Sequence, residues 1–431
     1  MAGASAARVV AHRTLLRVER DGAYADAAFR TEAERAGLDA RDRAFAQRLA
    51  YGAVQRRATI DHVLAGMSSR PLARVDPPLA AALRLGVYQL VWAGGVPDRA
   101  AVGETVELAK AAGGQGAASF ANAIMRRASR DARAVVEGLG DDTAEAAALA
   151  HSVPAWLAAQ WWEELGPEDA RALIARSNEA PESALRVNTL RATPGEVGDR
   201  LASAGVPVEA APELPEGLVL GAPFDIHGSD LFREGLVMPQ SRGSMLVARA
   251  LAPSPGERVL DLCAAPGAKA THLLALMEGE GSVVAVERRP ARAEALAENA
   301  RRLGADAVEV RVGDAADPQP DGPFDRVLLD PPCSDLGTLQ SRPDLRWRKE
   351  PETVARVAGV QSGLLDAAAA QVRPGGRLVY STCTISLEEN ERQVERFLAR
   401  SPGFRLAASR RLFPHRDGTD GFFIATLERD G

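Results

Sequence analysis

The part of the chain after Met238 alternates β-rich runs with helical segments, and this alternation constrains the fold more than any other feature. The runs are short and largely apolar, as in strands that are buried on both faces of a sheet. They are Arg258–Leu262, Ser282–Glu287, Ala307–Val312, Phe324–Asp330, Arg377–Thr382 and the closing run Gly421–Leu427. The pattern predicts an α/β domain of Rossmann-like type, with a parallel sheet and helices on both faces.

Before Met238, most of the sequence patterns are typical of helices. Leu83, Val87, Leu90 and Val91 form one apolar stripe, and the pairs Gly94-Gly95 and Gly113-Gly114 predict turns. Near the C-terminus, Ser386-Leu-Glu-Glu389 matches a capping box, which predicts that a helix begins there. We therefore expect a multidomain chain: an all-α domain over 1–135, a linker over 136–150, a small α+β unit over 151–230 and the α/β domain over 231–431.

Charge and composition narrow the class of protein. The 431 residues carry a formal net charge of −6, yet residues 1–130 hold 19 Lys+Arg against 12 Asp+Glu, and a basic first third hints at a polyanionic partner. The sequence has no apolar run of the roughly eighteen residues that a membrane span needs, so we expect a cytoplasmic protein. Its three cysteines fit neither a disulfide framework nor a zinc pattern, and we expect thiols and no metal.

Ligands of an open parallel sheet bind beyond the carboxyl ends of its strands. After the first predicted strand comes a turn of small residues, Cys263-Ala264-Ala265-Pro266-Gly267-Ala268-Lys269, which lets the backbone approach a ligand at a helix N-terminus. Glu287 ends the second strand, 20 residues after Gly267, where a carboxylate can accept from both ribose hydroxyls, and Asp314 could accept from an adenine amino group. NAD would satisfy these points equally, but the phosphate-binding G-x-G-x-x-G is incomplete, which favours S-adenosylmethionine.

The remaining two cysteines follow the fourth and fifth strands. Cys333 lies in Asp330-Pro-Pro-Cys-Ser334 and Cys383 in Tyr380-Ser-Thr-Cys-Thr384, while Cys263 lies in the first turn. A free cysteine is usually a small buried hydrophobe, but three cysteines in post-strand loops indicate chemistry. Carbon 5 of cytosine attacks a methyl sulfonium only after a thiolate adds at carbon 6. One thiol could add to C6, and a second could assist release of the methylated product. Asp330 could act as the acid near N3, where the addition places negative charge.

With these motifs the chain resembles the RNA (cytosine-5)-methyltransferases of the NOL/NOP/Sun family, in particular the branch that acts on small-subunit ribosomal RNA. The family's D-x-C-A-A-P-G-G-K-T stands here as Asp261–Ala270, its D-[AP]-P-C-S-G as Asp330–Asp335 and its Y-S-T-C-S as Tyr380–Thr384. Further matching segments are Arg342–Trp347, Glu389–Glu391 and Asp420–Phe423. Arg84–Leu90, Val96-Pro97, Val106–Lys110 and Asn122–Arg126 resemble a NusB-like helical domain, and Arg186–Asn188 resembles a small RNA-binding unit.

The resemblance implies roles for these residues. Cys383 would be the attacking thiolate and Cys333 would help to release the product; residues 263–269, Glu287, Asp314 and Asp330 would hold S-adenosylmethionine, with Arg292 in support. It also implies that the chain, expected to be a monomer, methylates C5 of a cytosine in 16S ribosomal RNA. Ala268, Ala270 and Asp335 depart from the family's Gly, Thr and Gly. The alanines are expected to weaken cofactor binding, and Asp335 places a carboxylate near the target base or phosphate.

Other readings stay open. The substrate could be another RNA, such as a tRNA. Alternatively, the chain could be a non-catalytic RNA-binding or antitermination factor, although the intact cysteines and Lys269 argue against a methyltransferase domain that has lost its activity. A DNA cytosine methyltransferase would use Cys333 as nucleophile, but its Glu-Asn-Val motif is missing and Cys383 would have no role. An amino-group methyltransferase would need an aromatic residue after Asp330-Pro-Pro332, where Cys333 stands.

Overall fold

A computed structural model describes residues 3–431 and divides them into two compact units. The helical unit comprises residues up to Glu179 together with Leu339–Lys349, and the sheet unit comprises Ala180–Thr338 and Glu350–Gly431. The helices between Ala144 and Arg176 therefore belong with the N-terminal helices, and a segment from the middle of the α/β sequence joins them. No helix in the described part of the chain is long and apolar enough to cross a membrane.

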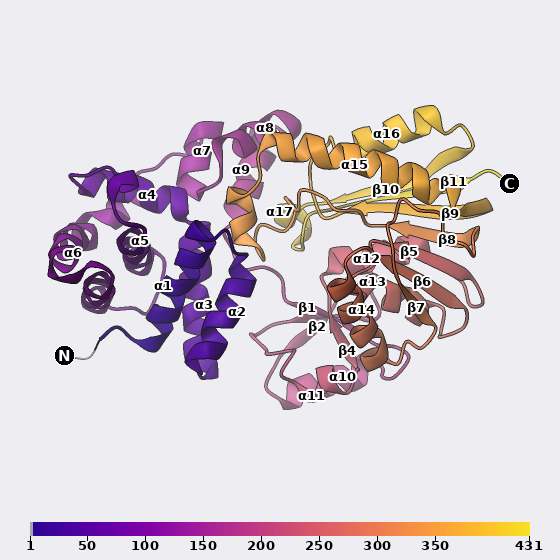
Figure 1. The fold of residues 1–431 in the computed structure, drawn as a ribbon, viewed down its shortest axis with the longest axis horizontal. Coiled ribbons are helices and arrows are strands. Elements are labelled where there is room, and N and C mark those ends of the chain that lie inside the picture. Colours follow the sequence, from indigo (N-terminus) through magenta and orange to yellow (C-terminus); the bar gives the residue numbers. More distant parts are fainter. Residues whose placement is uncertain (1–2) are drawn as a thin grey trace. The chain divides into compact units, whose positions relative to one another are not determined.

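The helical unit is all-α, as the sequence predicts (Figure 1). Its elements are α1 (Ala6–Arg20), α2 (Ala25–Ala36), α3 (Ala40–Gln55), α4 (Arg57–Met67), η1 (Leu72–Arg74), α5 (Pro77–Val91), α6 (Asp98–Glu137), α7 (Ala144–His151), α8 (Ala155–Leu165), α9 (Pro167–Arg176) and η2 (Pro343–Trp347). Leu83, Val87 and Leu90 of α5 are buried in its core. Of the two predicted glycine turns, one separates α5 from α6, and Gly113-Gly114 kinks α6.

The sheet unit contains two sheets. A small antiparallel sheet of order β2-β3-β1-β4 is built from β1 (Ala184–Val187), β2 (Val208–Ala210), β3 (Gly217–Leu220) and β4 (Val237–Pro239), with α10 (Pro194–Ser203) and α11 (Asp230–Arg233) beside it. The large sheet has the order β10-β11-β9-β8-β5-β6-β7. Strands β5 to β9 are parallel, β11 is antiparallel to β9, and β10 pairs antiparallel with β11.

The strands of the large sheet are β5 (Arg258–Leu262), β6 (Ser282–Glu287), β7 (Val308–Val312), β8 (Phe324–Leu329), β9 (Val372–Thr382), β10 (Phe404–Leu412) and β11 (Phe422–Arg429). Its helices are α12 (Arg242–Leu251), α13 (Ala268–Leu276), α14 (Pro290–Leu303), α15 (Pro351–Ala370), α16 (Glu391–Arg400) and α17 (Pro414–Asp417).

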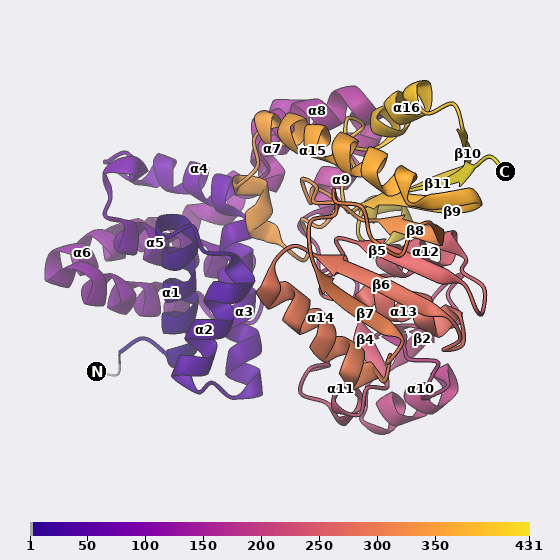
Figure 2. The ribbon, with the colours of Figure 1, turned by 45° about the vertical axis from the view of Figure 1, so that its right-hand side comes forward.

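Alternate residues of the central strands enter two cores on opposite faces of the large sheet. Val259 of β5 packs in the core with α12, α13 and α14, whereas Leu260 packs in the core with α15 and α16. Figure 2 shows α15 and α16 on one face and α13 and α14 on the other. Burial on both faces explains why these strands read as continuous apolar runs.

The predicted capping box is wrong. Helix α16 begins at Glu391, its N-cap residue is Asn390, and no side chain caps it. The Ser386 hydroxyl is buried without a partner, and the Glu389 carboxylate binds Ser334. Glu389 therefore does not cap the helix as its local sequence predicts, because its carboxylate binds a residue that is far away in the sequence.

Candidate active site

The residues predicted to hold a cofactor lie at the carboxyl ends of β5, β6 and β7. Cys263 to Gly267 form the turn between β5 and α13, and both Cys263 and Gly267 have left-handed backbone, with φ of 64° and 97°. A Cβ at Gly267 would lie 3.1 Å from Leu296 Cγ, so the turn is packed closely against α14. Small residues and positive φ leave the backbone of this turn open to a ligand at the start of α13.

Arg292 connects the turn to the acidic residue of the second strand. Its guanidinium donates to the Ala265 carbonyl at 2.7 Å and lies 3.4 Å from a carboxylate oxygen of Glu287. Glu287 is buried at the end of β6 and accepts from the Arg289 backbone at 2.9 Å. Asp314, after β7, is half-exposed and has Arg288 at 3.8 Å. The structure thus brings Ala265, Glu287 and Arg292 together, with Asp314 on the next strand.

Asp261 was not singled out as a site residue, yet it is the least satisfied group in this region. It is 1% exposed, and neither carboxylate oxygen has a hydrogen-bond partner. Burial raises the pKa of its carboxyl to about 8, against the pull of Lys269. An orphaned buried carboxyl is costly unless a ligand compensates it. A cationic ligand beside Glu287 and Asp314 would do so, and these carboxyl groups fit an adenosyl sulfonium, which carries hydroxyl and amino donors and a positive charge.

Lys269 and Asp330 form an ion pair at the centre of the sheet edge. The Lys269 Nζ lies 2.6 Å from Asp330 Oδ2, and the Ser381 hydroxyl donates to Asp330 Oδ1 at 3.2 Å. Burial disfavours the charge on Lys269, but Asp330 and Asp261 outweigh it and raise its pKa. Asp330 is therefore held between the first-strand turn and β9.

The two predicted catalytic thiols meet. Cys333 Sγ and Cys383 Sγ are 3.3 Å apart, and Asp335 Oδ1 lies 3.3 Å from Cys383 Sγ and 3.9 Å from Cys333 Sγ. The contact with Cys333, burial and nearby carboxylates raise the pKa of Cys383 well above its ordinary value. For Cys333, the contact with Cys383 acts to lower the pKa, but burial and the carboxylates outweigh it, so this pKa is raised too. Both sulfur atoms hold their protons at rest.

A buried network fixes the relative position of the two cysteine loops. Glu389 accepts from the Ser334 backbone at 2.8 Å and from Gln361 of α15 at 3.0 Å. The Ser334 hydroxyl also lies 2.8 Å from that of Thr384. Each cysteine is thus followed by a hydroxyl residue that binds the other loop. Sequence analysis missed Glu389 as a site residue, and the capping-box pattern around it pointed elsewhere.

The third cysteine, Cys263, belongs to the cofactor turn. Burial and surrounding carboxylates raise its pKa to about 12.

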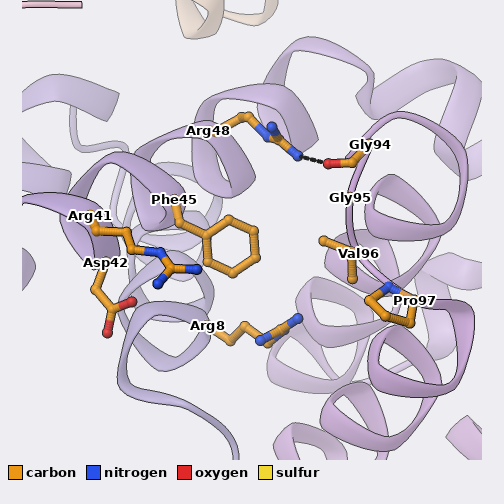
Figure 3. Close-up of a pocket in the computed structure, with 9 residues that line it drawn as sticks. All are labelled: Arg8, Arg41, Asp42, Phe45, Arg48, Gly94, Gly95, Val96 and Pro97. Carbon is orange, nitrogen blue, oxygen red and sulfur yellow. Dashed lines mark hydrogen bonds between the residues drawn. The ribbon is translucent and has the colours of Figure 1, made fainter.

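A separate hollow of about 360 Å³ lies in the helical unit, between α1, α3 and the turn before α6. Figure 3 shows Arg8, Arg41 and Arg48 arranged around the Phe45 ring. Arg8 lies 5.1 Å from the ring centroid, and Arg48 donates to the Gly94 carbonyl at 2.7 Å. Among residues 3–431, Arg41 forms no hydrogen bond or ion pair. Guanidinium groups beside an aromatic ring suit a nucleotide, since they can bind phosphate and stack on bases.

Comparison with known proteins identifies the family. Residues 248–428 match the 16S rRNA methyltransferases RsmB/F, residues 5–130 the NusB family and residues 153–227 the ferredoxin-like domain of RsmF/B-like methyltransferases. The chain is 34% identical to the probable ribosomal RNA small subunit methyltransferase B of Bacillus subtilis, over 98% of this chain and 99% of that protein. This chain belongs to the RsmB/F family of rRNA methyltransferases. The corresponding protein of Synechocystis is 36% identical over the same shares.

Solved structures agree with the family assignment. The crystal structure of PH0851 aligns over 99% of this chain and 100% of its own, with a TM-score of 0.81 and 27% identity. The structure of NSun6 from Pyrococcus horikoshii with SFG aligns over 64% of this chain and 98% of its own, with a TM-score of 0.61 and 25% identity. The RsmB/F-family chain is thus an RNA methyltransferase with a NusB-like helical domain.

Proposed function

We propose that the protein transfers a methyl group from S-adenosylmethionine to C5 of a cytosine in small-subunit ribosomal RNA through a covalent adduct with Cys383. The observation that carries this proposal is the 3.3 Å separation of Cys333 and Cys383 at the sheet edge beside Asp330. Family membership supports rRNA as the substrate, and the relative crystallised with SFG, an analogue of S-adenosylmethionine, supports the cofactor.

The residues at the carboxyl ends of the strands form two groups, one that would bind the cofactor and one that would act on the target base. The turn Cys263–Lys269, Glu287, Arg292 and Asp314 would hold S-adenosylmethionine, which supplies an electrophilic methyl group when bound. In the second group, the Cys383 sulfur would add to C6 of the cytosine ring. This addition pushes negative charge toward N3, where Asp330 in its protonated form would donate a hydrogen bond. Cys333 would assist release of the product after the methyl group is in place.

A nucleoside assay tests this function directly. Full-length protein is incubated with small-subunit rRNA and S-adenosylmethionine that carries a labelled methyl group, and the RNA is then digested to nucleosides. We expect the label in 5-methylcytidine. Label in an exocyclic amino group or a ribose would reject the C5 assignment. A parallel reaction contains tRNA in place of rRNA, and label in tRNA but not in rRNA would reject the proposed substrate.

The basic hollow around Phe45 is our candidate contact of the helical unit with that RNA. Replacing Arg41 with alanine should weaken RNA binding and lower the slope of log affinity against log salt by about one, because one phosphate contact is lost. Fluorescence anisotropy of a labelled rRNA fragment at several salt concentrations measures both quantities. Arg30→Ala, an exposed arginine on α2, is the matched control, and equal effects of the two variants would place the contact elsewhere.

A further inference from the structure

Asp335 lies at the two thiols, and the function proposed above gives it no role. Its Oδ1 accepts from Cys383 Sγ at 3.3 Å, within hydrogen-bond range for sulfur, and is farther, 3.9 Å, from Cys333 Sγ. The motif that this loop resembles has glycine at this position. The carboxylate thus departs from that motif, and it lies against the sulfur that is expected to attack.

The backbone holds Asp335 in this position. Its φ is 59°, a left-handed conformation that aspartate tolerates better than most side chains. The Asp335 carbonyl accepts from the Thr338 backbone at 3.0 Å, closing a turn, and Gly337 of that turn donates to the Cys383 carbonyl at 3.0 Å. A Cβ at Gly337 would overlap the Gly421 carbonyl oxygen. The turn that carries the carboxylate is therefore fastened to the loop that carries the nucleophile.

Charge around Cys383 opposes a preformed thiolate. Asp335, Asp330 and the Cys333 sulfur all act against ionisation of Cys383, with Lys269 the nearby cation. A site built to store a thiolate would not place a carboxylate against it. The same carboxylate is well placed to accept the proton while the sulfur–carbon bond forms, because general-base catalysis requires an acceptor at hydrogen-bond distance from the transferred proton.

We propose that Asp335 is the general base that takes the Cys383 proton as the sulfur adds to C6, an inference that rests on the covalent route proposed above. In this step the S–H bond breaks and its proton passes to Asp335 Oδ1. The Sγ–C6 bond forms, and the C5=C6 electron pair moves into the ring. After C5 has taken up the methyl group, the C5–H bond breaks with loss of its proton to solvent water, a step that Cys333 would assist, and its electron pair re-forms C5=C6. The C6–Sγ bond breaks at the same time, and the sulfur takes back the proton from Asp335.

Two substitutions test the role without straining the turn. Asp335→Asn keeps the shape and removes the basicity, and Asp335→Gly suits the left-handed backbone and removes the side chain. Asp306→Asn, an exposed aspartate of the same unit, is the control. Single-turnover methyl transfer is measured at saturating RNA and S-adenosylmethionine. Alkylation of Cys383 by iodoacetamide at pH 8 is followed by peptide mass spectrometry without RNA. EDTA is present, because Cys333, Asp335 and Cys383 offer ligand atoms within 4.8 Å of one another.

The two readouts should move in opposite directions. We expect methyl transfer to fall about 100-fold or more in both variants, while alkylation becomes faster because a like charge beside the thiolate is gone. Unchanged transfer in either variant would overturn the inference, and so would a loss of both transfer and alkylation, which would mean that Asp335 only positions the loop. A wild-type protein that forms no 5-methylcytidine would instead reject the proposed function, so the two failures are distinguishable.

Discussion

Replacing Cys383 with alanine is expected to abolish methyl transfer, whereas replacing Cys333 is expected to leave methylated RNA attached to the protein. Without the Cys383 sulfur, C5 of cytosine stays a poor nucleophile, and we expect a loss on the order of 10⁴-fold or more. Without Cys333, addition and methylation can proceed through Cys383, but release of the adduct slows. The 3.3 Å between the two sulfur atoms allows both to act on one ring.

Denaturing gels and single-turnover assays separate these outcomes. The Cys333→Ala variant with RNA and labelled S-adenosylmethionine should give a band that carries protein, RNA and label, which nuclease treatment reduces to protein size. Wild-type protein treated in the same way is the control, and it should release its product and leave no trapped species. A trapped species with Cys383→Ala instead would exchange the roles of the two thiols, and no effect of either substitution would exclude a covalent route.

The sequence predicts the large sheet well because its strands are buried on both faces. The bounds predicted for β5 and β6 are those observed, Arg258–Leu262 and Ser282–Glu287. Strand β10 (Phe404–Leu412) is missed because it is an exposed edge strand that pairs with β11 alone and has no apolar run. Burial on two faces leaves a strong sequence signal, and an exposed edge leaves almost none.

The two thiols could be placed together from sequence because parallel strands end at one edge of a sheet. The residues that hold the two cysteine loops in place could not be predicted from the sequence. Glu389 has a local pattern that predicts a cap, and only the fold shows that it binds Ser334 instead. Asp261 looks like an ordinary strand residue until the structure shows both of its oxygen atoms buried without partners. Contacts between residues far apart in sequence carry no periodic signal.

The motif Arg342–Trp347 is recognisable from sequence, but the place of the segment Leu339–Lys349 in the helical unit is not. Arg346 is fully buried there. Its guanidinium donates to the carbonyl oxygens of Ser152, Ser177, Gln55 and Leu339 and to Asn178 Oδ1, at 3.0 to 3.3 Å. Trp347, next in the chain, donates to the Val54 carbonyl at 2.7 Å. One side chain thus satisfies buried oxygen atoms from several parts of the unit.

Replacing Arg346 with alanine should therefore strongly destabilise the helical unit. It leaves several buried carbonyl groups without donors, and we expect a loss of about 3 kcal/mol or more in the free energy of unfolding. All five tryptophans, Trp92, Trp156, Trp161, Trp162 and Trp347, belong to the helical unit. Urea unfolding followed by tryptophan fluorescence consequently reports on this unit alone, even though the whole chain need not unfold in one step.

The partners of Arg346 also predict the order of its variants. Arg346→Lys keeps the charge and some of the donors, so its unfolding midpoint should lie between those of wild type and Arg346→Ala, because an ammonium cannot reproduce the planar fork of five donors. Arg99→Ala, an exposed arginine of the same unit, should change the stability by less than about 0.5 kcal/mol. An Arg346→Ala midpoint equal to that of Arg99→Ala would mean that Leu339–Lys349 contributes little to the helical unit, and that the hydrogen bonds of Arg346 are replaced by water when the side chain is removed.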